Sequence, residues 1–142
     1  MRRLFPPFLS GKAAVGLLLV RLVVGAAFVL HGWSKIQSPG GPMGWMGPDS
    51  LIPGILLGAA AFSEFAGGLA LILGAMTPLA AVALIATMIG ALQHHLSAAD
   101  PFVKPGGPSW ELAGVYLAIS ILFLLVGPRR ISVDAMLFDA RP

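Results

Sequence analysis

The sequence predicts an all-α integral membrane protein, built as a bundle of four transmembrane helices. Of its 142 residues, 57% are hydrophobic and 11% are charged, whereas soluble domains carry about 25% charged residues. The hydrophobic residues also fall into four blocks separated by glycine, proline and charge. No stretch between the blocks is long enough for a soluble core of its own, so we expect residues 1–142 to form a single membrane domain.

Each block is close to the roughly 20 apolar residues that a helix needs to cross the bilayer. Gly32 is expected to end the first span, Gly74 the second and Gly127 the fourth. Because Thr77-Pro78 follows Gly74 closely, the second and third helices should form a tight hairpin. The predicted spans are residues 13–30, 51–73, 78–96 and 110–126.

The basic residues indicate the orientation of the bundle. By the positive-inside rule, their excess outside the first and last spans predicts that both termini lie in the cytoplasm. This excess comprises Arg2, Arg3, Lys12, Arg129, Arg130 and Arg141, against Lys35 and Lys104 in the two opposite loops. The net charge of +3 is therefore a topology signal, and we expect no nucleic-acid partner, because the charges form no single basic stripe.

The first block has a second interpretation, as a cleaved signal peptide, because basic residues precede it. Arg21 within the apolar run and the lack of a clear A-x-A site argue against this. The first outer loop, residues 38–48, is too rich in glycine and proline for a regular helix or central strand. Trp33, Trp45 and Trp110 all lie near the predicted outer interface, as an aromatic belt does.

Two charged residues lie within the spans. Arg21 and Glu64 are each about 12 to 14 Å from the inner end of their helix, at 1.5 Å per residue. Since a charge near mid-span costs about 3 kcal/mol, we predict an Arg21–Glu64 ion pair, with Gly25 and Gly68 on the same faces allowing close helix packing. The pair could simply join two helices, or Glu64 could exchange protons beside a quinone-like ring.

A second polar set lies at the outer ends of the helices. It comprises His31, Lys35, Gln93, His94, His95 and Glu111. We expect these residues to form a polar pocket in the outer half of the bundle, with His94 directed inward because it shares a face with small residues. His31 and His94 could bind a noncovalent haem b axially. Each histidine could instead be an interfacial residue in contact with headgroup water, and we expect no metal site, because a third zinc ligand is poorly placed.

The absence of cysteine excludes thiol chemistry and cysteine-ligated clusters, so a redox role would need a bound cofactor or a partner. The sequence also contains no G-x-S-x-G, P-loop or Rossmann fingerprint. These absences argue against hydrolase and phosphate-binding functions.

Three segments together resemble the DoxX family of small prokaryotic membrane proteins. The first runs from Arg21-Leu22 through Gly25 and Phe28 to His31-Gly32-x-x-Lys35; the second is Ser63-Glu64-Phe65-Ala66-Gly67-Gly68, continuing to Gly74; the third is Gly127-Pro128-Arg129-Arg130-Ile131-Ser132-Val133-Asp134-Ala135. Arg21, His31, Lys35, Glu64 and Asp134 match the family pattern. Arg129 in place of glycine and a shorter first outer loop depart from it.

The resemblance implies a four-helix bundle in the cytoplasmic membrane of a prokaryote that serves as a subunit of a membrane oxidoreductase. Some family members resemble the quinone-reducing subunit of thiosulfate:quinone oxidoreductase. Under this hypothesis Glu64 and Arg21 are catalytic, and His31 and Lys35 bind a cofactor such as quinone. The outer polar set described above adds His94 and Glu111 to the cofactor-binding residues and haem to the possible cofactors. His31 would donate a hydrogen bond to a quinone oxygen, in a pocket between the first two helices.

Two other functions remain open. A non-catalytic accessory or assembly subunit would use its polar residues for packing and its first outer loop to dock a larger membrane protein. A small-solute transporter would use the Glu64 carboxyl, although the sequence lacks the inverted repeats and broken helices of such proteins.

Overall fold

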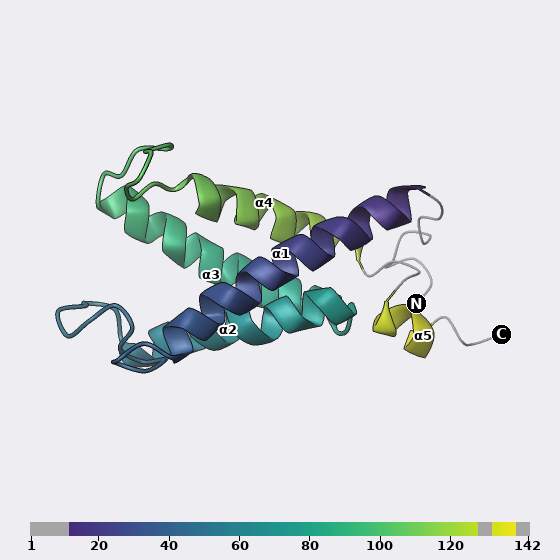
Figure 1. Cartoon of the computed structure of the whole chain (residues 1–142), viewed down its shortest axis with the longest axis horizontal. Coiled ribbons are helices and arrows are strands. Elements are labelled where there is room, and N and C mark those ends of the chain that lie inside the picture. The colour runs from purple at the N-terminus through teal and green to yellow at the C-terminus, as the bar shows by residue number, and fades with distance from the viewer. Residues whose placement is uncertain (1–11, 128–131, 139–142) are drawn as a thin grey trace.

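The computed structural model describes residues 12–127 and 132–138. Within these ranges it contains helices and no β-strand. The helices are α1 (Lys12–Ile36), α2 (Gly54–Leu73), α3 (Thr77–Ser97), α4 (Glu111–Val126) and the short α5 (Val133–Phe138). α1 to α4 run alternately up and down as a four-helix bundle (Figure 1). The predicted fold class is confirmed.

The two ends of the bundle differ. At the loop end, residues 37–53 (loop 1) join α1 to α2, and residues 98–110 (loop 2) join α3 to α4. At the hairpin end, a short turn joins α2 to α3, and α5 lies nearby (Figure 1). Most basic residues that predict the orientation lie outside the described residues, so the cytoplasmic position of the termini stays a prediction.

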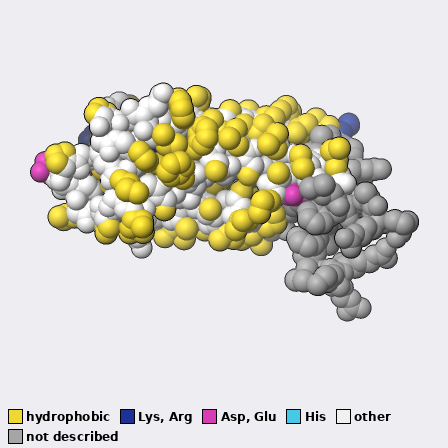
Figure 2. Space-filling model, turned by 90° about the horizontal axis from the view of Figure 1, so that it is seen from below, with side chains coloured by type: hydrophobic (Ala, Val, Ile, Leu, Met, Phe, Trp, Pro, Cys, Tyr) yellow, Lys and Arg dark blue, Asp and Glu magenta, His cyan; other side chains and the backbone are white. Residues whose placement is uncertain are grey.

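The surface between the two ends suits a lipid environment. α1, α2 and α3 are each long and apolar enough to cross a membrane. α4 is shorter, since its 16 residues extend over roughly 24 Å at 1.5 Å per residue. On the face seen in Figure 2, hydrophobic side chains cover the middle of the molecule, and charged side chains lie toward its ends. The chain is a multi-pass membrane protein.

The predicted spans agree closely with the helices, except at the end of α1. α2 begins at Gly54, after the predicted residue 51, because Pro53 disfavours helical geometry in the residue before it. Gly74 ends α2 in the left-handed conformation, with φ of 65°, which confirms the tight hairpin. Gly32 does not end α1, which continues to Ile36.

Glycines allow α1 and α2 to pack with their backbones in contact. A Cβ atom on Gly32 would lie 2.7 Å from the Ala61 carbonyl oxygen and even closer to the Phe65 backbone nitrogen. A Cβ atom on Gly68 would lie 2.6 Å from the Gly25 carbonyl oxygen. Gly32 is therefore a helix-packing residue and not a helix-ending one. The contacts between α1 and α2 stabilise the helix through this position.

We expect Gly32→Ala to destabilise the bundle by about 1–3 kcal/mol, because the added methyl group meets backbone atoms that cannot rotate away. Thermal unfolding in detergent micelles measures the effect. Gly16→Ala is the matched control, since no atom beyond its own stretch of helix lies within 4 Å of its Cβ position. Equal stability of the two variants would contradict the packing described here.

At the hairpin end, α5 supplies the cap of α3. The Asp134 carboxylate accepts hydrogen bonds from the backbone N–H groups of Met76, at 2.7 Å, and Thr77, at 3.0 Å. The Asp134 backbone N–H in turn donates to the Gly74 carbonyl oxygen at 2.9 Å. A carboxylate at a helix N-terminus satisfies unpaired donors and complements the helix dipole. Asp134 thereby fastens α5 to the α2–α3 hairpin.

Candidate functional site

The predicted Arg21–Glu64 ion pair is wrong. The Arg21 side chain is 2% exposed and extends toward the hairpin end, where its Nε donates to the Leu71 carbonyl oxygen at 2.8 Å and its Nη2 to the Ile72 carbonyl oxygen at 3.3 Å. The last carbonyls of a helix lack intrahelical partners and carry the negative end of its dipole. Arg21 therefore caps α2, and it does not line the pocket described below.

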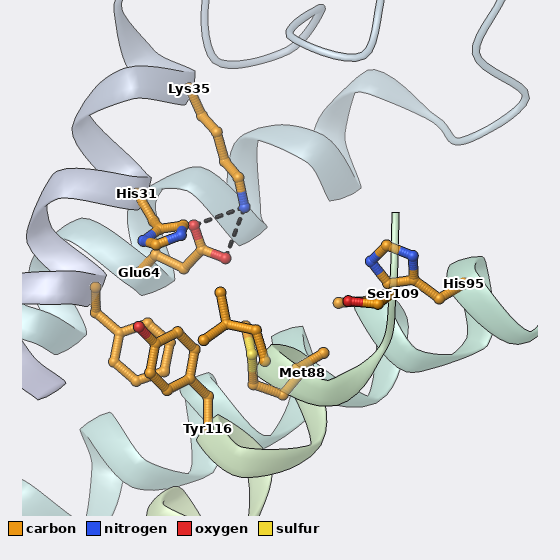
Figure 3. A pocket seen from close by; sticks show the side chains of 11 residues that line it. His31, Lys35, Glu64, Met88, His95, Ser109 and Tyr116 are labelled. Carbon is orange, nitrogen blue, oxygen red and sulfur yellow. Dashed lines mark hydrogen bonds and ion pairs between the residues drawn. The ribbon is translucent and has the colours of Figure 1, made fainter. Parts of the chain in front are cut away.

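Glu64 pairs with Lys35. The Lys35 ammonium lies 2.6 Å from each of the two Glu64 carboxylate oxygens (Figure 3). Glu64 is 3% exposed and lies near the middle of α2, whereas the Lys35 side chain is 19% exposed and reaches inward from the loop end. A long side chain can carry its charge far from its own Cα. Equal Cα depth was therefore a poor guide to the partner of Glu64.

Loop 1 covers this ion pair from the loop end. The Lys35 ammonium lies 4.5 Å from the centre of the Trp45 ring, a cation–π contact. The Trp45 indole N–H donates to the Leu57 carbonyl oxygen at 3.2 Å, which fixes the ring over α2. Loop 1 itself is a series of turns, as its glycine and proline content predicts.

A pocket of about 230 Å³ lies beside the ion pair. All four long helices and loop 2 contribute to it, so it is not confined to the space between α1 and α2. Its walls combine apolar side chains with a few polar groups. They are formed by Phe28, His31, Lys35, Glu64, Met88, Ala91, His95, Ser109, Leu112, Ala113 and Tyr116. The predicted polar pocket therefore exists, in the half of the bundle nearest the loops.

His31 and Tyr116 form an aromatic wall near Glu64. Their rings meet edge to face at 6.0 Å, and Tyr116 also packs on Phe28 at 4.8 Å. His31 Nδ1 lies 2.9 Å from the Ala27 carbonyl oxygen, which can only accept, so Nδ1 carries the hydrogen and the neutral ring leaves Nε2 as an acceptor. A neutral His31 suits a hydroxyl-bearing ligand, and its predicted donation to a quinone oxygen requires a protonated ring.

His95, not His94, lines the pocket. His95 Nδ1 lies 2.8 Å from Asp100 Oδ2, which orients the ring at the rim next to Ser109 (Figure 3). His94 is exposed and borders a second pocket beside loop 1, so the expectation that it points inward is wrong. Because His31 and His94 line different pockets, they do not form a bis-histidine haem site.

Glu111 is also separate from the pocket. It is the exposed first residue of α4 and does not line the cavity. No group of three or more His, Asp and Glu side chains within residues 12–127 and 132–138 could hold a metal ion. Of the predicted cofactor-binding set, the pocket therefore brings together His31 and Lys35, along with Glu64 from the predicted catalytic pair.

Sequence reasoning overlooked Tyr116. It is the single tyrosine of the chain and lies within an apolar span. A tyrosine hydroxyl buried in lipid or protein usually has a hydrogen-bond partner, so a tyrosine within an apolar span indicates a polar site nearby. The Tyr116 side chain lines the same pocket as Glu64.

Comparison with known proteins agrees with this architecture. The sequence model of the DoxX family matches residues 16–96. "Putative oxidoreductase CatD" of Bacillus subtilis (strain 168) is 29% identical over 127 residues, covering 89% of this chain and 90% of that protein. "Inner membrane protein YqjF" of Escherichia coli (strain K12) is 29% identical over 129 residues, covering 87% of this chain and 92% of that protein. No solved structure matches the chain.

Proposed function

Because this chain belongs to the DoxX family, we propose that it is a quinone-binding subunit of an oxidoreductase in the inner membrane of a prokaryote. Its similarity to one protein named as an oxidoreductase and another named as an inner membrane protein supports this proposal. The observation that carries it is the Lys35–Glu64 pair, with its carboxylate buried, facing a small, mostly apolar pocket.

The charge of the pocket favours a neutral ligand. Among the described residues that line it, Lys35 is the one Lys or Arg, and Glu64 already neutralises it through both carboxylate oxygens. An anionic substrate would have to displace Glu64 or approach it closely, and like charges in a buried site repel strongly. A quinone meets no such penalty.

The size of the pocket favours a single ring. An engineered apolar cavity of about 150 Å³ binds benzene, and the cavity here measures about 230 Å³. It is smaller than the roughly 300 Å³ at which drug-sized pockets begin. The volume accommodates one substituted six-membered ring, with its apolar tail outside.

The polar groups fit the two redox forms of such a ring. Reduction of a quinone adds two electrons, from an associated redox protein, and two protons, one to each carbonyl oxygen. The Lys35 ammonium can donate a hydrogen bond to a quinone oxygen, and the Glu64 carboxylate can accept one from a hydroquinone hydroxyl. In its neutral form, with Nδ1 bonded to the Ala27 carbonyl oxygen, the His31 ring offers Nε2 as a second acceptor to the reduced form.

Glu64→Gln is expected to change the affinities for the two forms in opposite directions. It removes the charged acceptor for the hydroquinone hydroxyl and frees Lys35 to donate to the quinone. Because a hydrogen bond to a charged group contributes about 1.5–3 kcal/mol, the ratio of the two dissociation constants should shift at least about tenfold toward the quinone. Quenching of tryptophan fluorescence by a decyl-substituted benzoquinone, and displacement of this probe by its reduced form, provide the measurement.

Glu111→Gln is the matched control, since this exposed carboxylate lies outside the pocket. Its ratio should equal that of the unchanged protein. The proposal would be contradicted if quenching of the unchanged protein did not saturate with the probe. It would also be contradicted if Glu64→Gln weakened binding of the quinone and the hydroquinone to the same extent.

A role as an accessory subunit is the second candidate. It is favoured by the exposed apolar side chains of loop 1, in particular Met43 and Leu51, which could contact a larger membrane protein. This role predicts stoichiometric copurification with a partner in mild detergent and no saturable quinone binding.

A further inference from the structure

The pocket opens sideways, between α1 and α4. Of the described side chains that line it, His31 on α1 and Leu112 on α4 are exposed, while the others are buried or half-buried. Both lie within about two turns of the loop end of their helices. The mouth of the pocket is therefore on the flank of the bundle.

Helix packing and loop contacts border the other sides of the pocket. α1 packs mainly on α2, and α4 packs mainly on α3, whereas α1 and α4 make few backbone contacts with each other. At the loop end, the Trp45 ring covers Lys35, and the His95–Asp100 pair joins α3 to loop 2. These contacts restrict entry from the loop end.

The surface around the mouth is apolar. Leu30 on α1 and Val115 on α4, near His31 and Leu112 on their helices, are exposed. They belong to the hydrophobic surface that suits lipid, and His31 is tolerated there because its Nδ1 is bonded to its own helix. The exposed apolar side chains beside the mouth would therefore face lipid.

We propose that the space between His31 and Leu112 is a lateral portal through which a bilayer-dissolved ring compound enters the pocket, leaving its apolar tail among the lipids. This inference rests on the proposed function and extends it in two ways. It assigns the ligand to the membrane-dissolved class, and it makes Leu112 the side chain that controls access.

Leu112→Trp in lipid nanodiscs tests the portal. The decyl-substituted benzoquinone should then associate and dissociate about tenfold more slowly, with its dissociation constant almost unchanged, because a larger side chain at the mouth hinders both directions equally. Leu112→Ala should accelerate both steps. Stopped-flow quenching of tryptophan fluorescence gives the two rates.

Val115→Trp is the matched control. Val115 is 46% exposed and Leu112 is 49% exposed on the same helix, but Val115 does not line the pocket. Its rates should equal those of the unchanged protein.

The outcomes separate the portal from the proposed function. Normal quinone binding with unchanged rates in Leu112→Trp would overturn the portal and leave the quinone site intact. A faster dissociation with weaker binding would also overturn it, since the introduced tryptophan side chain would then be filling the pocket instead of blocking its mouth. If the unchanged protein failed to bind the probe, both the portal and the proposed quinone site would be contradicted.

Discussion

Replacing Lys35 with methionine is expected to lower the free energy of unfolding by about 3–5 kcal/mol, the cost of leaving a buried charge without its partner. Glu64 is 3% exposed, and the Lys35 ammonium contacts both of its carboxylate oxygens at 2.6 Å. The substitution keeps a long apolar stem but removes the charge, along with the cation–π contact to Trp45. Thermal or denaturant unfolding in mixed micelles measures the loss.

The double variant Lys35→Met/Glu64→Leu provides the control. Removing both charges leaves no unpaired ion, and buried ion pairs can be replaced by apolar groups of similar size with little net loss. The double variant should therefore be more stable than Lys35→Met alone while losing quinone binding. If the two variants were equally unstable, packing of the Lys35 stem would explain the loss, and the ion pair would not.

Asp134→Ala is expected to destabilise the hairpin end by about 2–4 kcal/mol, because two backbone donors lose a charged acceptor. The donors are the N–H groups of Met76 and Thr77, at the start of α3. The attraction between the Asp134 carboxylate and the buried Arg21 is lost as well. Hydrogen exchange of the α3 N-terminal amides should accelerate, and the unfolding temperature should fall.

Two further variants test this interpretation. Asp134→Asn keeps one acceptor oxygen and should lose less stability than Asp134→Ala. Met136→Ala changes an exposed side chain of the same short helix and should have little effect. A loss from Met136→Ala as large as that from Asp134→Ala would mean that α5 is held by its side-chain packing, and not by the cap.

The sequence predicted the helices better than it predicted the side-chain partners. Hydrophobic blocks are set by bilayer thickness, so their number and most boundaries follow from composition. Partners depend on side-chain reach. Arg21 binds the last carbonyls of α2 at the hairpin end, whereas Lys35 reaches inward from the loop end to Glu64, and neither partner is encoded in Cα depth.

The inward faces were predictable only where helix backbones touch. On α1 and α2 small residues mark the interface, and Gly32 and Gly68 lie there. On α3 the inward face carries the larger Leu84 and Met88, which fill the centre of the bundle, while Gly90 is exposed. This difference explains why His95, and not His94, reaches the pocket.

Photolabelling tests the central claim, that the pocket beside Lys35 and Glu64 is the ligand site. A decyl-substituted benzoquinone with an azide on its ring would be irradiated with the protein in nanodiscs, and the labelled residues would be identified by mass spectrometry. We expect label on pocket residues such as Tyr116 and Met88, and its loss when excess unlabelled quinone is added. Label confined to lipid-facing residues such as Leu19 and Val23, and unaffected by the competitor, would contradict the account.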